Sequence, residues 1–313
     1  MTPLVGDAQL RQYLAAGGLV ERLDEMSEEY RRELRKMLLL AADTELRSVP
    51  MLYGYFDLGV PYRYVQPMLS VIQDELGHAH IDYRLLEALG EDVDALLFER
   101  PIEAWASPYF FDMPMETWAE VAVAEGLGEY GGGVLVRNIY HHTSYAPWRR
   151  ALAKVDLEEN FHVKFGQTLM RELARDDEQR PALQAAVDWL FPLLLEFVGP
   201  PGREVDPQID LRLKGQRVDD LRQDYLRFMA SFCEELGLRV PAHFEPDLDR
   251  YVLDIPFPCA FDPERKRWDF GSAVTWPDVL KRWKARGPLA DEHLRLLRSG
   301  QHSLNAWAAR SSA

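Results

Sequence analysis

The sequence predicts an all-α protein built around a four-helix bundle, and three observations carry that prediction. The chain of 313 residues contains two Glu-x-x-His motifs. Each motif glutamate follows a lone glutamate at the same offset of 30 residues, from 45 to 75 and from 129 to 159. All of these positions lie in apolar stretches of helical character. The six residues are Glu45, Glu75, His78, Glu129, Glu159 and His162.

The common offset gives the bundle its expected geometry. Residues three apart share one face of a helix, so each motif can direct a carboxylate and an imidazole to one point. A chain that rises ~15 residues along one helix and returns ~15 residues along an antiparallel neighbour comes back to its starting height. Each lone glutamate is therefore expected to face the motif that follows it, at one level of the bundle.

Four carboxylates and two imidazoles at one level are the donor set of a di-iron or di-manganese carboxylate site. Zinc sites, by contrast, favour fewer ligands in a tetrahedral arrangement. The alternative is that these residues lie on the wet faces of amphipathic helices. The apolar flanks 37–42 and 65–72 argue against it, because an unpaired carboxylate buried there would be costly. We expect two iron ions, with manganese as the alternative metal.

Three further acidic residues accompany the motifs. Asp74 and Glu158 each precede a motif glutamate directly and lie four residues before a motif histidine. Metal-bound histidines usually donate their second N–H to a carboxylate, so these two residues are the candidate partners, and we expect Asp74 to hold His162 across the bundle. Ordinary surface charge is the alternative. Glu125 could compete with Glu129 as a ligand, but it breaks the common offset.

Composition excludes several classes of protein. A net charge of −15 argues against sequence-independent binding of nucleic acid, which needs a basic surface. No apolar run reaches the ~18 residues of a membrane span, and no basic region followed by an apolar one marks the N-terminus as a secretion signal. The only two cysteines, Cys233 and Cys259, cannot form a disulfide framework. We expect a cytoplasmic protein.

The first helical hairpin is expected to follow an N-terminal arm over residues 1–26. Its first helix should begin with Ser27 as N-cap and end near Val49, because Pro50 follows. An aromatic loop then leads to a helix over residues 63–90. Pro67 is tolerable there if it falls in the first turn, and otherwise it kinks the helix. Gly90 is the expected stop.

A crossover over residues 91–114 should join this hairpin to the second one. The third helix begins near Thr117 and must carry Glu129 through a glycine-rich stretch at 126–133. Glycine is unfavourable inside a helix, so either close helix packing or a π-bulge or substrate cavity is expected there. The fourth helix carries Glu159 and His162.

The rest of the chain predicts further helices over 179–198 and 216–237, then a proline-rich region with possible short strands. Two more helices are expected near 276–286 and 289–310. Residues 27–240 would form the bundle domain, and residues 241–313 a C-terminal extension that packs on the bundle or on a partner.

Beyond these patterns, the sequence resembles the oxygenase subunits of bacterial ring-1,2-phenylacetyl-CoA epoxidase and its cousin benzoyl-CoA epoxidase, over roughly residues 25–310. The matching segments are Gln73–His78, Thr143–Tyr145, Glu158–His162, Asp219–Gln223 and Glu235–Pro241. The resemblance implies a ferritin-like fold in which the six motif residues are the iron ligands.

The same resemblance implies a di-iron monooxygenase that epoxidises the aromatic ring of an aryl-acyl-CoA in aromatic catabolism, using O₂ and NADPH. No nucleotide-binding motif is present, so electrons would come from a separate flavin and iron–sulfur reductase. A non-catalytic ferritin-like subunit, or further copies of the chain, would be partners.

The substrate prediction depends on cations that could hold CoA phosphates. Two lysines of the family are missing here: Val71 occupies one position, and Ala106 and Ser107 the region of the other. Cations near residues 137–154 or 265–267 could substitute, or could be ordinary surface charge. The alternatives are therefore an oxygenase of benzoyl-CoA or of an aromatic substrate without CoA, or a non-catalytic ferritin-like partner subunit.

Overall fold

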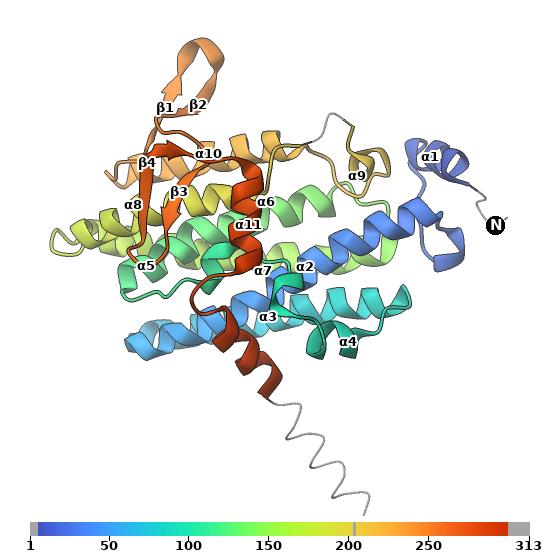
Figure 1. Cartoon of the computed structure of the whole chain (residues 1–313), viewed down its shortest axis with the longest axis horizontal. Helices are drawn as coiled ribbons and strands as arrows, with labels where there is room; N and C mark the ends of the chain where they lie inside the picture. The colour runs from blue at the N-terminus through green and yellow to red at the C-terminus, as the bar shows by residue number, and fades with distance from the viewer. Residues whose placement is uncertain (1–5, 203–204, 300–313) are drawn as a thin grey trace, which may run out of the picture.

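The computed structural model describes residues 6–202 and 205–299, and it confirms the all-α class (Figure 1). Its long helices are α2 (Glu28–Gly54), α3 (Tyr62–Ala88) and α7 (Ala146–Arg175). The fourth member of the bundle is a composite of α5 (Trp118–Val123), a π-helical segment (Ala124–Gly128) and α6 (Glu129–Tyr140). Helices α2 and α3 pack side by side, as do α6 and α7, which gives the two predicted hairpins.

Helix α2 begins as predicted and ends later than predicted. The Ser27 hydroxyl accepts a hydrogen bond from the Tyr30 N–H at 3.2 Å, which satisfies one of the free donors of the first turn. The helix does not end at Pro50 but continues to Gly54. Proline removes one backbone hydrogen bond, yet Val49, Met51 and Leu52 are all buried around it. Their burial outweighs the lost bond and holds the last turn.

Helix α3 contains Pro67 as its sixth residue, beyond the first turn. The missing N–H leaves the carbonyl of Arg63 without its helical partner, and the exposure of Arg63 allows water to take that place. Gly90 is the predicted stop: its φ is 88°, the left-handed conformation that favours glycine after a helix.

Both features expected for the glycine-rich stretch, close helix packing and a π-helical turn, are present in the structure. Residues Ala124–Gly128 are π-helical, and all five are buried. At the same level the backbone of α7 comes very close, so that a Cβ atom on Gly166 would lie 2.3 Å from the carbonyl carbon of Glu125. The same atom would lie 2.5 Å from the backbone nitrogen of Gly126. Glycine is needed at 166 because backbone, rather than a flexible side chain, fills the space.

We therefore expect Gly166→Ala to destabilise the protein by about 1–3 kcal/mol or more, since the two helices must move apart. Gly77→Ala is the matched control: Gly77 also lies inside a long helix, but a Cβ atom there meets nothing within 4 Å. Alanine at 77 should leave stability unchanged or raise it by up to about 1 kcal/mol. Urea unfolding of both variants checks this, and equal stabilities would contradict the close approach.

The remaining elements surround the bundle. Helix α1 (Asp7–Ala15) precedes it, and α4 (Val93–Phe98) lies in the crossover. Helices α8 (Arg180–Phe197), α9 (Pro207–Asp210) and α10 (Val218–Glu235) follow it. The predicted helices at 179–198 and 216–237 are thus confirmed to within two residues at each end.

The C-terminal region contains the short strands that the sequence allowed. Strands β1 (Ala242–Glu245) and β2 (Arg250–Leu253) form one antiparallel hairpin, and β3 (Cys259–Asp262) and β4 (Arg267–Ala273) another. Helix α11 (Trp276–Ala285) follows, as predicted. Residues 290–299 are helical, and the rest of the predicted helix 289–310 lies outside the described residues. The division into arm, bundle domain and extension stays a prediction.

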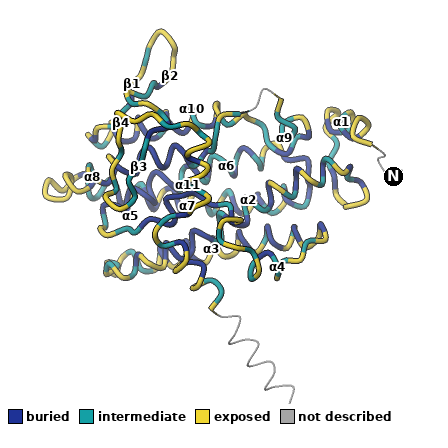
Figure 2. The backbone as a smooth tube through the Cα atoms, in the orientation of Figure 1, coloured by how far each residue is buried: buried dark blue, intermediate teal, exposed yellow. Residues whose placement is uncertain are grey.

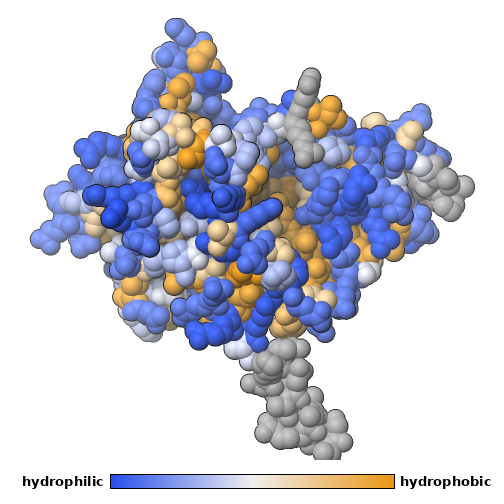
Figure 3. Space-filling view, in the orientation of Figure 1, coloured by the Kyte–Doolittle hydropathy of each residue, from blue (hydrophilic) through white to orange (hydrophobic). Residues whose placement is uncertain are grey.

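Two apolar clusters occupy the two ends of the bundle, and buried backbone is continuous along the inner faces of its helices (Figure 2). Along α2, Ala42 belongs to one cluster and Val49 to the other, and along α3 the change occurs between Ile72 and Ala79. On each helix the predicted site residues lie between the last residue of one cluster and the first residue of the other. These polar groups therefore form a layer between two apolar cores. The outer face drawn in Figure 3 is, by contrast, mostly hydrophilic, with apolar residues showing mainly toward its middle.

Candidate metal centre

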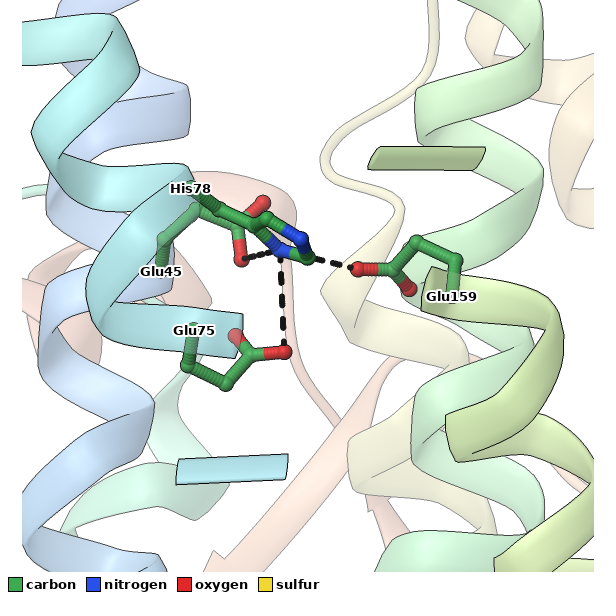
Figure 4. A group of neighbouring side chains, drawn as sticks. All are labelled: Glu45, Glu75, His78 and Glu159. Atoms are coloured by element: carbon green, nitrogen blue, oxygen red, sulfur yellow. Dashed lines mark ion pairs between the residues drawn. The ribbon is translucent and has the colours of Figure 1, made fainter. Parts of the chain in front are cut away.

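The six predicted site residues converge on this polar layer. Ligand atoms of Glu45, Glu75, His78 and Glu159 lie within 4.8 Å of one another, and so do those of Glu75, Glu129 and His162. Four helices contribute: α2 and α3 on one side, α6 and α7 on the other. Figure 4 shows the first group, with the α2 and α3 side chains directed at Glu159. The sequence offset thus predicted the correct level on all four helices.

Each histidine presents its Nδ1 atom to the carboxylates. His78 Nδ1 lies 3.4 Å from Glu159 Oε1 and 3.7 Å from Glu45 Oε2. His162 Nδ1 lies 3.1 Å from Glu75 Oε1 and 3.7 Å from Glu129 Oε2. The two imidazole centroids are 5.9 Å apart. Each group therefore has its own histidine and its own lone glutamate.

Glu75 and Glu159 lie between the two histidines. Glu75 Oε1 is 3.9 Å from His78 Nδ1 as well as 3.1 Å from His162 Nδ1. Glu159 Oε1 is 3.4 Å from His78 Nδ1 and 4.0 Å from His162 Nδ1. Of these two carboxylates, only Glu75 belongs to both groups of ligand atoms, whereas Glu159 belongs to the group around His78.

The chemistry of these groups fits a pair of metal ions. Glu75 Oε1, His78 Nδ1 and His162 Nδ1 are buried without any hydrogen-bond partner. Burial, and next the charge of Glu45, raises the pKa of Glu75 to about 7. Burial also raises the pKa of Glu159 to about 7. Two divalent cations would provide partners for the orphaned ligand atoms and offset the charge of the crowded carboxylates.

Asp74 and Glu158 support the histidines from outside the cluster. Asp74 Oδ2 lies 3.2 Å from His162 Nε2, across the bundle as expected, and Glu158 Oε2 lies 3.2 Å from His78 Nε2. Burial would raise the pKa of Glu158, but Lys154 and His78 hold it below its usual range. A carboxylate on Nε2 favours the tautomer that leaves Nδ1 free for a metal.

We expect Asp74→Asn to keep the fold and to weaken metal binding by about 10- to 100-fold, because an amide orients His162 less strongly than a carboxylate. Metal titration of the purified variant measures the effect, and circular dichroism verifies the fold. Wild-type affinity in the variant would show that Asp74 is only surface charge.

The sequence pattern missed two groups beside the cluster. Asp82 is buried one helical turn after His78, and burial followed by the charge of Glu45 raises its pKa well above the usual range. Its spacing of four residues from His78 was the available signal. Tyr55, which ends up at the end of α2 only because the helix passes Pro50, is also fully buried, next to Glu125.

The other histidines and the cysteines stay outside the centre. His80, His141 and His142 are exposed, as predicted, and His302 lies outside the described residues. Cys233 is buried, and among the described residues both cysteines are free thiols. None of the described helices is long and apolar enough to cross a membrane.

Comparison with known proteins gives an independent result. A sequence model of the family described as phenylacetic acid catabolic protein matches residues 11–250, which include all six residues of the centre. The chain is also 26% identical over 297 residues to one of the subunits of the 1,2-phenylacetyl-CoA epoxidase of Escherichia coli (strain K12), and the match covers 92% of this chain and 89% of its relative. The match to the family spans most of the chain, so the protein belongs to the phenylacetic acid catabolic protein family.

Proposed function

We propose that this chain is the oxygenase subunit of a di-iron monooxygenase that epoxidises the aromatic ring of an aryl-acyl-CoA, such as phenylacetyl-CoA, in aromatic catabolism. The observation that carries the proposal is the pair of metal-sized groups that share Glu75 within one buried layer. Similarity to a phenylacetyl-CoA epoxidase subunit supports the reaction type. Iron is the proposed metal, and manganese the alternative.

The chain's own residues have distinct roles in this proposal. Glu75 would serve both metal positions, Glu45, His78 and Glu159 would hold one of the ions with it, and Glu129 and His162 would hold the other. Asp74 and Glu158 would hold the imidazoles in place.

A bound di-iron centre would supply the activation of O₂, of which one oxygen atom enters the ring as an epoxide and the other leaves as water. The two apolar clusters above and below the layer would keep bulk water from the reacting atoms. Two electrons and two protons are also consumed, and the electrons would come from NAD(P)H through a separate reductase. The similar protein is named as one subunit of an enzyme, which supports an assembly with partner chains, such as a non-catalytic ferritin-like subunit.

The substrate is the least constrained part of the proposal. Val71 is fully buried in the apolar core, and the Ser107 hydroxyl accepts a hydrogen bond from Arg286 at 2.5 Å. Three of the cations considered for CoA phosphates are engaged: Arg150 with Glu21, Lys154 with Glu158, and Lys266 with Glu116 and Glu120. An aromatic substrate without CoA is therefore the second candidate, and benzoyl-CoA is the alternative among the CoA thioesters.

The test is an assay of the iron-loaded chain with an electron-donating reductase, any required partner chain and ¹⁸O₂. Phenylacetyl-CoA, benzoyl-CoA and free phenylacetate are compared. We expect one ¹⁸O atom in the product of an aryl-CoA, with one NAD(P)H consumed per product. Labelled product from phenylacetate alone would replace the proposed substrate. Unchanged turnover in Glu45→Ala and His162→Ala variants within the assembled system would indicate a non-catalytic partner subunit.

A further inference from the structure

Glu125 is the most unusual residue beside the metal centre. It is 0% exposed, and neither of its carboxylate oxygens has a hydrogen-bond partner. A buried carboxylate without a partner is costly, and native proteins rarely keep one unless it serves a purpose. Burial, and next the charge of Glu129, raises its pKa well above the usual range.

The position of Glu125 directs it to the cluster. It lies in the π-helical segment Ala124–Gly128, four residues before Glu129. Residues four apart lie on the same face of a helix, so the Glu125 side chain is on the face that carries Glu129. Glu129 is a member of the second group of ligands, which that face meets.

That second group is also the less complete one. Four residues converge in the group around His78, but only three, Glu75, Glu129 and His162, converge in the group around His162. The oxygens of Glu125 are outside this group, so ligation requires rotation of its side chain. The neighbouring Tyr55 hydroxyl is buried beside the Glu125 carboxyl group and acts on it, so such a rotation would give up that contact.

We propose that Glu125 is a seventh metal-binding carboxylate of this chain, which completes the position formed by Glu75, Glu129 and His162. The inference rests on the proposed metal centre. It adds a residue that the offset pattern disfavoured.

The experiment is a titration of the metal-stripped full chain with Co²⁺, followed by the visible absorption of bound cobalt, in wild type and in Glu125→Gln. Glutamine keeps the size of the side chain and removes its charge. We expect wild type to bind two ions, and the variant to bind one as before and the second about 10- to 100-fold more weakly. Thermal unfolding without metal should show the variant at least as stable as wild type, because a buried charge is removed.

Glu120→Gln is the matched control. Glu120 lies in the same helical run and is also buried, but its carboxylate is engaged by Trp189 and Lys266, so this variant should bind both ions like wild type. If Glu125→Gln does not fold, Glu125→Ala gives the same comparison without a buried amide. Two ions bound with wild-type affinity in a folded Glu125 variant would overturn the inference. Failure of wild type to bind cobalt would instead reject the metal centre itself.

Discussion

Replacing Glu75 by alanine is expected to abolish binding of both metal ions. Glu75 is the residue that the two groups share, and its Oε1 atom faces both histidines, so its removal leaves neither position with its full donor set. The fold should persist, because the pKa of this buried carboxyl group is raised to about 7 and the cluster loses one crowded negative charge. Metal analysis after growth with iron, together with circular dichroism, measures both parts of the expectation.

Glu45→Ala is the comparison for that result. Glu45 belongs only to the group around His78, so this variant should retain about one ion per chain, held by Glu75, Glu129 and His162. Loss of both ions in Glu75→Ala and of one in Glu45→Ala would establish which carboxylate is shared. Equal losses in the two variants would contradict the assignment.

Asp112→Ala is expected to destabilise the protein by about 3–5 kcal/mol, the usual result of leaving buried charges unpaired. Asp112 is fully buried between two arginines, at 2.5 Å from Arg47 Nη2 and 2.6 Å from Arg286 Nη2. Arg47 lies on α2, two residues after Glu45, and Arg286 directly follows α11. The carboxylate therefore ties the C-terminal region to the helix that carries Glu45.

Urea unfolding with matched controls tests this ion network. Asp112→Asn keeps the shape and part of the hydrogen bonding, so it should fall between wild type and alanine. Glu87→Ala removes an exposed partner of Arg84 on α3 and should change stability by less than about 1 kcal/mol. A similarly small change for Asp112→Ala would show that water satisfies the two arginines.

The convergence of the six residues was predictable because its signal is local and periodic. The offset of 30 residues places each lone glutamate level with the motif that follows it. Packing of the two hairpins then puts the residues of all four helices at one level of the bundle. The contact of Asp74 with His162 was predicted on another ground, that metal-bound histidines usually donate their second N–H to a carboxylate.

The predictions that failed or were absent depend on tertiary packing. Pro50 does not end its helix because buried neighbours hold the next turn in place. The Arg47–Asp112–Arg286 network joins residues far apart in the chain, so no periodic pattern in the sequence indicates it.

Anomalous diffraction at the iron edge, from crystals of the full chain grown with iron, tests the central claim most directly. We predict two peaks inside the bundle, one between Glu45, His78 and Glu159 and the other between Glu129, His162 and Glu75. No peak at this layer, a single peak, or iron bound elsewhere in crystals with an intact bundle would contradict a two-metal centre built from these six residues.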